Sequence, residues 1–517
     1  MLIRNARVVD GSGAPWYRAD VIVDHGRIVR IGRLEAHAAR NTIDATDLVL
    51  APGFVDMMGQ TATPFLKNPA AAINLLSQGI TTLLTGEGDS AAPLNDAEAK
   101  SAGWSTMREY LALLDKKGMP VNIAQTVGHT QIRRIVIGDV DRAPSAAELE
   151  RMKSLVREAM EAGAVGVSTA LIYPPAVFAK TGEVAALAAV AGEFGGRYYT
   201  HMRNEGDRLL EAIDEAITIG EAAHTPVHIF HLKTAGQANW GKMDLALARI
   251  QAARIAGREV DSDVYPYINN GLDLDAFVHP RFFAGGQEKF KELLKDPAVR
   301  ADIRKTMEND TNYENWFRHT GRDWQRVVVG RIAAQAYQDH NGKDVVAIAQ
   351  ATGRDPWDVF FDILSEGGAF AMPQTMSEAN KIKAMKAEFV SFCTDVGPAG
   401  GSSIASHPRA YGSFPRILSH YVRELGVMSL ERAISKMSAV AVNQVMAPDR
   451  GRISEGLAAD LVLFDPETVT DRATFANPTA PSEGIKYVLV NGRIVFADGK
   501  LTGELPGKVL RGPGYRR

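Results

Sequence analysis

Two histidines end two short strand-like runs near the middle of the 517-residue chain. His201 closes the run RYYTH and His231 closes VHIFH, and residues 207–223 between them repeat apolar side chains at helical spacing. A strand, a helix and a strand of these lengths predict a βαβ unit, so both histidines should project from the C-terminal edge of one parallel sheet. Neutral imidazole is a common metal ligand, and two imidazoles held together form half of a zinc site. A single strand-end histidine would be interpreted as structural, whereas two in register favour a metal.

The composition is that of an ordinary globular protein. Hydrophobic residues make up 45%, charged residues 23%, and the net charge is −3, which provides no electrostatic basis for binding nucleic acid or an anionic membrane. The single cysteine, Cys393, excludes an intrachain disulfide and a cysteine-rich metal site. No run approaches the roughly 20 apolar residues of a membrane span. The chain begins directly in a strand pattern without a signal-peptide core, so we expect a cytoplasmic protein, although a removed leader would leave no trace.

Strand and helix patterns divide the chain into a small and a large part. Residues 1–50 and 446–517 consist of short strand runs with Asp-Gly, His-Gly and Asn-Gly turns, which predict one small sheet domain assembled from both ends. Residues 51–445 alternate strands with helices, and the eight strand runs predict an α/β chain folded as a (β/α)8 TIM barrel. The strands are expected at residues 53–58, 80–86, 121–127, 165–171, 198–201, 227–231, 259–265 and 388–395. The long connection between strands seven and eight predicts an inserted subdomain at about 269–387, over the mouth of the barrel.

Sequence motifs along nearly the whole chain carry a family resemblance. They are LIRNARVVDGSG, LAPGFVD, GITTLLTGEG, GVSTALIYPP, YYTHMRNEG, FHLKTAG, DVYPY, HPRAYGSFPRIL, GRISEGLAADLVLFDP and VNGRIV. In order and coverage these motifs resemble the amidohydrolase superfamily, and within it the N-acyl-D-amino-acid deacylases (D-aminoacylases). The resemblance implies a zinc-bearing (β/α)8 barrel, a flanking β-sandwich built from both termini, and hydrolysis of an amide bond.

Two departures from the family pattern concern the metal. The His-x-His that family members carry after the first strand is replaced by Met58 and Gln60, which are unsuited to zinc, so we expect one tightly bound zinc ion per chain. The family's metal-binding cysteine after the second strand is also missing. Glu87 in the same loop could supply an anionic ligand, with Asp89 as the alternative. Two histidines and one carboxylate with an open fourth position form a known catalytic zinc arrangement.

The resemblance also assigns the remaining site residues. Asp395, at the end of EFVSFCTD, matches the family's acid–base residue, which takes a proton from the attacking water and passes it to the leaving nitrogen. Lys233, Tyr173 and Tyr265 match positions that bind the free carboxylate of the substrate. We add Arg409 and His129 as candidates for the substrate pocket, although His129 could equally serve to stabilise its loop.

The sequence therefore predicts a zinc-dependent amidohydrolase that acts on a small N-acylated amino acid, with the D-enantiomer expected from the family. One alternative is a hydrolase of fatty-acyl or aromatic amides that lack a free carboxylate. Another is a catalytically silent relative that binds a ligand or serves as a scaffold. Chirality, acyl chain and oligomeric state, a homo-oligomer included, stay open at this stage.

Overall fold

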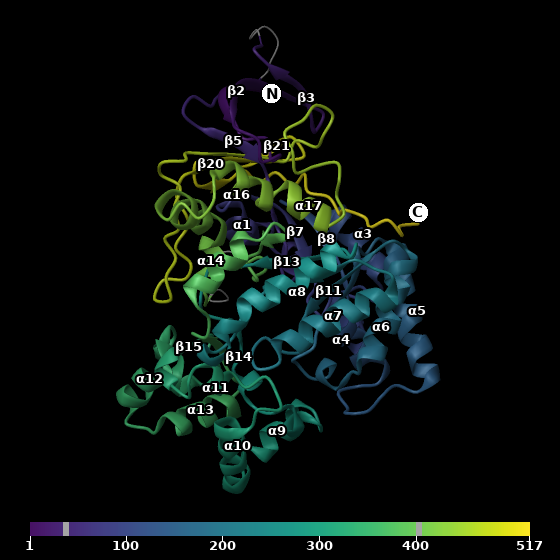
Figure 1. Cartoon of the computed structure of the whole chain (residues 1–517), viewed down its shortest axis with the longest axis vertical. Coiled ribbons are helices and arrows are strands. Elements are labelled where there is room, and N and C mark those ends of the chain that lie inside the picture. The colour runs from purple at the N-terminus through teal and green to yellow at the C-terminus, as the bar shows by residue number, and fades with distance from the viewer. Residues whose placement is uncertain (35–40, 400–405, 517) are drawn as a thin grey trace.

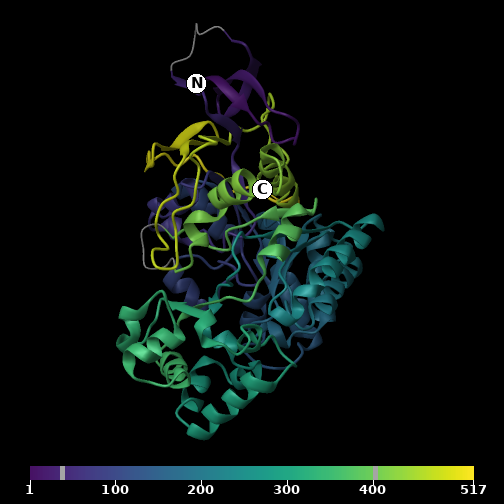
Figure 2. The ribbon, with the colours of Figure 1, turned by 60° about the vertical axis from the view of Figure 1, so that its left-hand side comes forward.

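The structure of the protein is a computed structural model that describes residues 1–34, 41–399 and 406–516. Figure 1 shows strands from both ends of the chain together at one end of the molecule, the barrel in the middle and the inserted segment at the opposite end, and Figure 2 shows the same order from another side. None of the helices in these ranges is long and apolar enough to cross a membrane.

The two ends of the chain form one nine-stranded sheet. Its order is β22-β21-β20-β19-β5-β1-β2-β3, and β4 pairs with β1. The tight turns predicted at His25-Gly26, Asn491-Gly492 and Asp498-Gly499 all have positive φ, as two-residue hairpins require. The strands are β1 (Leu2–Val8), β2 (Tyr17–Asp24), β3 (Arg27–Gly32), β4 (Thr42–Asp44), β5 (Val49–Pro52), β19 (Leu461–Phe464), β20 (Ile485–Val490), β21 (Arg493–Ala497) and β22 (Lys500–Leu501). The division of the chain near residues 50 and 446 is consistent with this sheet and stays a prediction.

All eight predicted barrel strands are present and parallel, although most are shorter than expected. Two sheets carry them, β6-β7-β8 and β9-β10-β11-β12-β13-β18, and β8 and β9 are two parts of one predicted strand. The backbone N–H of Met57 donates to the carbonyl of Phe392 (3.3 Å), which links the edges near β6 and β18. The strands are β6 (Phe54–Asp56), β7 (Ile80–Thr85), β8 (Asn122–Gln125), β9 (Val127–Gly128), β10 (Gly166–Ala170), β11 (Arg197–His201), β12 (Val227–Ile229), β13 (Val260–Val264) and β18 (Val390–Phe392).

Helices cover the outside of this ring, as a barrel requires. The main ones are α3 (Met107–Lys117), α5 (Ala146–Ala162), α6 (Thr181–Glu193), α7 (Leu209–Ala223), α8 (Met243–Ile255), α14 (Glu378–Lys386), α16 (Leu430–Met437) and α17 (Ala439–Gln444). The inside is filled by buried side chains from several strands, among them Val55, Leu84, Ala124, Tyr199 and Phe230. The ring is thus a packed core, and the C-terminal strand ends are left to build a site.

The inserted segment has a core of its own. Its helices are α9 (Gln287–Leu293), α10 (Pro297–Asn309), α11 (Trp316–His319), α12 (Val345–Thr352) and α13 (Pro356–Ser365), and its antiparallel sheet has the order β14-β17-β15-β16. These strands are β14 (Leu272–Asp273), β15 (Val327–Gly330), β16 (Lys343–Asp344) and β17 (Phe370–Pro373). The predicted end at 387 places α14 in the insertion, but α14 packs against α8, β13 and β18 of the barrel. The separately packed part therefore ends near β17.

Candidate metal centre

The two strand-end histidines meet, as the parallel strands predict. Thr200 of β11 pairs with Ile229 of β12, so His201 and His231 leave the sheet at neighbouring positions. Asp263 of β13 fixes the backbone at His231, just after the end of β12, because its Oδ1 accepts a hydrogen bond from the backbone N–H of His231 (2.9 Å). Its Oδ2 lies 2.7 Å from Nε2 of His228, which is fully buried and has a structural role here.

Glu87 completes a group of three candidate ligands. Glu87 Oε1 lies 2.7 Å from His201 Nδ1 and 3.2 Å from His231 Nε2, and the two histidine nitrogens are 3.1 Å apart. The loop that carries Glu87 follows β7 and has Gly86 and Gly88 on either side, both with positive φ. A Cβ at Gly86 would lie 2.3 Å from Thr126 Oγ1, and one at Gly88 would lie 2.6 Å from the backbone nitrogen of Ala170. Only glycines let this loop lie so close to the neighbouring strands and aim Glu87 at the histidines.

The chemistry of the three atoms fits a zinc ion. Two imidazole nitrogens and one carboxylate oxygen are a known zinc donor set. His231 uses Nε2 towards the cluster, and its Nδ1 lies 3.0 Å from Glu205 Oε1, the carboxylate backing that metal-bound histidines usually have. Burial and Lys233 lower the pKa of His231, but Glu205 and Glu87 outweigh them and raise it to about 9. The surrounding carboxylates therefore favour positive charge at this point.

Asp395 lies beside the cluster, after the end of β18. Gln60 Nε2 donates to Asp395 Oδ1 (2.8 Å) and Arg409 Nη1 donates to Asp395 Oδ2 (2.6 Å). Burial raises the pKa of the Asp395 carboxyl and the Arg409 guanidinium opposes part of that rise. Asp56 fixes the backbone just before Asp395, because its Oδ1 accepts a hydrogen bond from the backbone N–H of Thr394 (2.8 Å).

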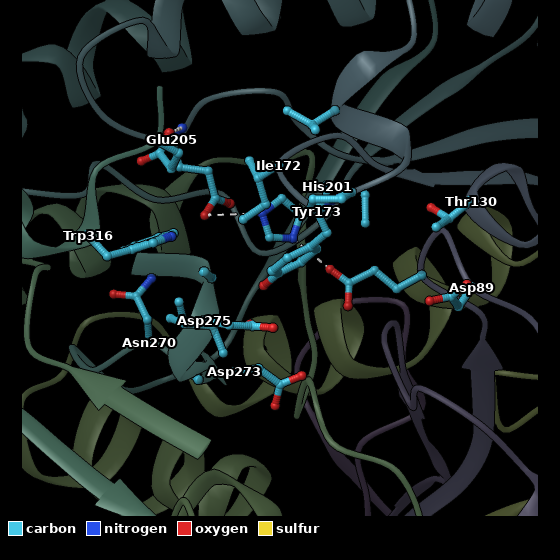
Figure 3. A pocket seen from close by; sticks show the side chains of 18 of the residues that line it. Asp89, Thr130, Ile172, Tyr173, His201, Glu205, Asn270, Asp273, Asp275 and Trp316 are labelled. Carbon is cyan, nitrogen blue, oxygen red and sulfur yellow. Dashed lines mark hydrogen bonds and ion pairs between the residues drawn. The ribbon is translucent and has the colours of Figure 1, made fainter. Parts of the chain in front are cut away.

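A single cavity of about 1170 Å³ joins the cluster to the inserted segment. Besides the three candidate ligands and Asp395, it is lined by four residues predicted to bind substrate, Lys233, Tyr173, Tyr265 and Arg409. Figure 3 shows Glu205, His201 and Tyr173 close together, with Asn270, Asp273 and Asp275 across the cavity from them. The insertion therefore forms one wall of the cavity, as expected for a segment over the barrel mouth.

The comparisons with known proteins agree with this geometry. A family model described as "Amidohydrolase family" matches residues 41–496. The chain belongs to the amidohydrolase family. D-aminoacylase from Alcaligenes xylosoxydans xylosoxydans is 33% identical over 525 residues, covering 99% of this chain and 97% of that protein. N-acyl-D-aspartate deacylase from the same organism is 35% identical, covering 98% of this chain and 94% of the relative.

Solved structures of amidohydrolases show the same fold over the whole chain. The structure of N-acyl-D-glutamate deacylase from Bordetella bronchiseptica, complexed with zinc and a phosphonate inhibitor, has a TM-score of 0.83 at 32% identity and covers 99% of both chains. A structure of D-aminoacylase, described with a binuclear metal centre, has a TM-score of 0.82 with the same identity and coverage. The predicted α/β barrel fold and family are thereby confirmed.

Two candidates of the sequence analysis lie away from the centre of this amidohydrolase. Asp89, the alternative to Glu87, pairs with Arg134 (2.9 Å) and has a side chain that is 60% exposed. Figure 3 likewise shows Asp89 well apart from His201. His129 is fully buried, does not line the cavity, and contacts Glu183 through Nε2 (2.9 Å). The candidate role of His129 in the substrate pocket is therefore corrected to the structural one.

A buried ion-pair network explains the position of His129. Both Glu183 oxygens accept from Arg133 Nη1 at 2.7 Å. Burial raises the pKa of Glu183, but His129 and Arg133 outweigh it, so the net shift is downward. The network ties α4 (His129–Val136) to α6 and serves the stability of the fold.

Sequence reasoning missed two residues of the amidohydrolase centre. Glu205 accepts from Lys233 Nζ (2.6 Å), contacts His231, and has its Oε2 3.5 Å from His201 Nε2. Its position four residues after His201, within YYTHMRNEG, was the available signal. Gln60 was noted only as a poor ligand, whereas its amide contacts both Glu87 and Asp395.

Proposed function

We propose that this amidohydrolase cleaves the amide bond of N-acyl-D-amino acids and releases a carboxylic acid and the free amino acid. The observation that carries the proposal is that one cavity holds a group of three candidate metal ligands, an adjacent carboxyl at Asp395, and the cation of Lys233. The D-aminoacylase and the N-acyl-D-aspartate deacylase to which the chain is similar support the substrate class.

Glu87, His201 and His231 would hold one zinc ion. Zinc in such a site supplies Lewis acidity towards the scissile carbonyl and makes a water molecule acidic enough to attack at neutral pH. Glu205 orients His231 from behind, and the buried surroundings keep competing water away from the histidines.

Asp395 moves the proton. Its ionised carboxylate accepts a proton from the attacking water as the new C–O bond forms, and it then delivers this proton to the amide nitrogen as the C–N bond breaks. Gln60 and Arg409 each donate a hydrogen bond to one of its oxygens, so both oxygens are fixed in orientation. An amide nitrogen is a poor leaving group without this proton, and the same carboxyl therefore serves both steps.

Lys233 would bind the free carboxylate of the substrate, with the phenols of Tyr173 and Tyr265 beside it. The lysine is buried and its charge lies at the cavity wall. A carboxylate entering this cavity leaves water, so a cation and hydroxyl donors are needed to offset its desolvation.

One observation favours the alternative of a neutral amide substrate. Lys233 is already paired with Glu205, and Arg409 is already paired with Asp395. Each cation is thus neutralised by a carboxylate, and a fatty-acyl or aromatic amide without a carboxylate would meet no excess of positive charge.

A substrate panel with controlled metal content tests the proposal. The purified chain is depleted with a chelator, reloaded with zinc, and assayed on N-acetyl-D-amino acids, their L-enantiomers and the corresponding carboxamides. Zinc-dependent hydrolysis of the D-series acids supports the proposal. Hydrolysis confined to neutral amides would move the alternative ahead. A chain that binds no zinc and hydrolyses nothing would be a scaffold or binding relative.

A further inference from the structure

Two carboxylates of the candidate site point towards the same place, and a neutral amide lies between them. Gln60 Nε2 is 2.8 Å from Glu87 Oε2 and 2.8 Å from Asp395 Oδ1. One amide nitrogen carries two N–H groups, so it can donate one hydrogen bond to each carboxylate. Carboxylates this close repel each other unless a cation or hydrogen-bond donors lie between them. The amide of Gln60 therefore offsets the repulsion that a second metal ion would otherwise offset.

We propose that Gln60 is a positioning residue that makes this site mononuclear. Its amide nitrogen takes the place between Glu87 and Asp395, excludes a second cation there, and holds Asp395 in its working orientation. This inference rests on the proposed metal-dependent hydrolysis, since it assigns Glu87 to the metal and Asp395 to the proton.

The backbone around Gln60 defines where its amide lies. Gln60 has a φ of 56°, in the left-handed region that costs a non-glycine residue energy and that persists only when its surroundings hold it. The surroundings do so here: the N–H of Gly86 donates to the carbonyl of Gln60 (2.7 Å), and the N–H of Gly59 donates to the carbonyl of Leu84 (2.7 Å). The loop after β6 is thus fastened to the loop that carries Glu87.

The other residue of the same loop does not offer a second metal site. Met58 is fully buried inside the barrel and does not line the cavity. Gln60 directs its donor nitrogen, not its carbonyl oxygen, at the two carboxylates. Across residues 1–34, 41–399 and 406–516, the only group of three or more histidine, cysteine or acidic side chains that could hold a metal is Glu87 with His201 and His231.

Two substitutions separate charge from hydrogen bonding. Gln60→Glu keeps the shape but removes the donors and adds a third carboxylate, so a cation becomes the favourable occupant. Gln60→Met removes the donors but leaves an uncharged side chain of similar length in the same place, and its thioether is a poor zinc ligand. Asp395 therefore loses its orientation while the metal count should not change. Gln287→Glu is the matched control, because Gln287 Nε2 donates to the Asp275 carboxylate (2.8 Å) at the insertion wall of the same cavity.

The experiment measures zinc equivalents by elemental analysis and calorimetric titration after chelation, beside kcat, KM and melting temperature. We expect one equivalent in the wild type, in Gln60→Met and in the Gln287→Glu control, and a second equivalent in Gln60→Glu. Gln60→Met should lose kcat by about 10²-fold, the scale for a misplaced catalytic group, with little change in KM or melting temperature. Two equivalents in the wild type, one in Gln60→Glu, or a normal kcat in Gln60→Met would each overturn the inference.

The metal counts also separate this inference from the proposed function. If zinc responds to Gln60→Glu as expected but no N-acyl amino acid is hydrolysed, the mononuclear role of Gln60 stands and the proposed substrate falls. If the wild type hydrolyses these substrates while the count stays unchanged in Gln60→Glu, the substrate stands and the role of Gln60 falls.

Discussion

Replacing Lys233 with Met tests which kind of substrate the cavity accepts. The side chain keeps much of its length and loses its charge. Lys233 is 2% exposed and its Nζ lies 2.6 Å from a fully buried Glu205 oxygen, so it belongs to the buried pairs whose loss is costly and not to the weak surface pairs. Without the lysine, the uncompensated carboxylate of Glu205 would face the incoming substrate.

The expected loss depends on the charge of the substrate. For an N-acyl amino acid, the fall in kcat/KM should correspond to a loss of about 2–5 kcal/mol of transition-state stabilisation, the scale for truncating one partner of a buried charged pair. At 1.4 kcal/mol per factor of ten, this is roughly a 30- to 4,000-fold loss. For the matching carboxamide the loss in kcat/KM should be under about tenfold, because that substrate has no negative charge for Lys233 to bind.

The assay compares both substrates in three variants. Lys233→Met is measured beside Lys233→Met/Glu205→Gln, in which the orphaned carboxylate is also neutralised. Lys242→Met, on a nearby lysine outside the cavity that donates to the Asp207 carbonyl, is the control. If the double variant recovers the rate on the N-acyl amino acid, the loss came from Glu205 and not from a missing contact. Equal losses on acid and carboxamide would refute carboxylate recognition by Lys233.

Three further predictions concern metal, proton and stability. His201→Ala and His231→Ala should each lose bound zinc and activity together, as shown by elemental analysis; a variant that retains both would not have lost a ligand. Asp395→Asn should keep its zinc but lower kcat by about 10² or more, and a near-normal rate would assign the proton to another group. Glu183→Gln should lower the unfolding free energy by about 3–5 kcal/mol at pH 7 in a denaturant titration, whereas Glu193→Gln, an exposed pair on the same helix, should cost under about 1 kcal/mol. Because the pKa of Glu183 is lowered by folding, its contribution is complete above the ordinary value of 4.5 and is lost as the pH falls through the folded pKa, so the gap between wild type and Glu183→Gln should close in acid. A gap that is the same at every pH would contradict this.

The regular elements of the fold could be predicted from local sequence. Side chains alternate along a strand and parallel strands end at one edge, so RYYTH and VHIFH were enough to bring His201 and His231 together. Turn pairs such as Asn491-Gly492 have few alternatives to a tight hairpin, because φ must be positive at both positions. The strands of the insertion were missed, since each is only two to four residues long and carries too little periodicity to recognise.

Some residues of the candidate site could likewise be predicted from local sequence, whereas others could not. Sequence alone determined the two histidines, the acidic loop after β7 and the carboxyl after β18, because these follow from strand ends and motif order. Only the tertiary structure chose Glu87 over Asp89, since the path of that loop depends on close packing of Gly86 and Gly88 against strands that are distant in sequence. It likewise decided which charges are paired: Lys233 with Glu205, and Asp395 with Arg409. Such pairings depend on loop conformations fixed by long-range contacts, and neither residue spacing nor side-chain periodicity carries that information.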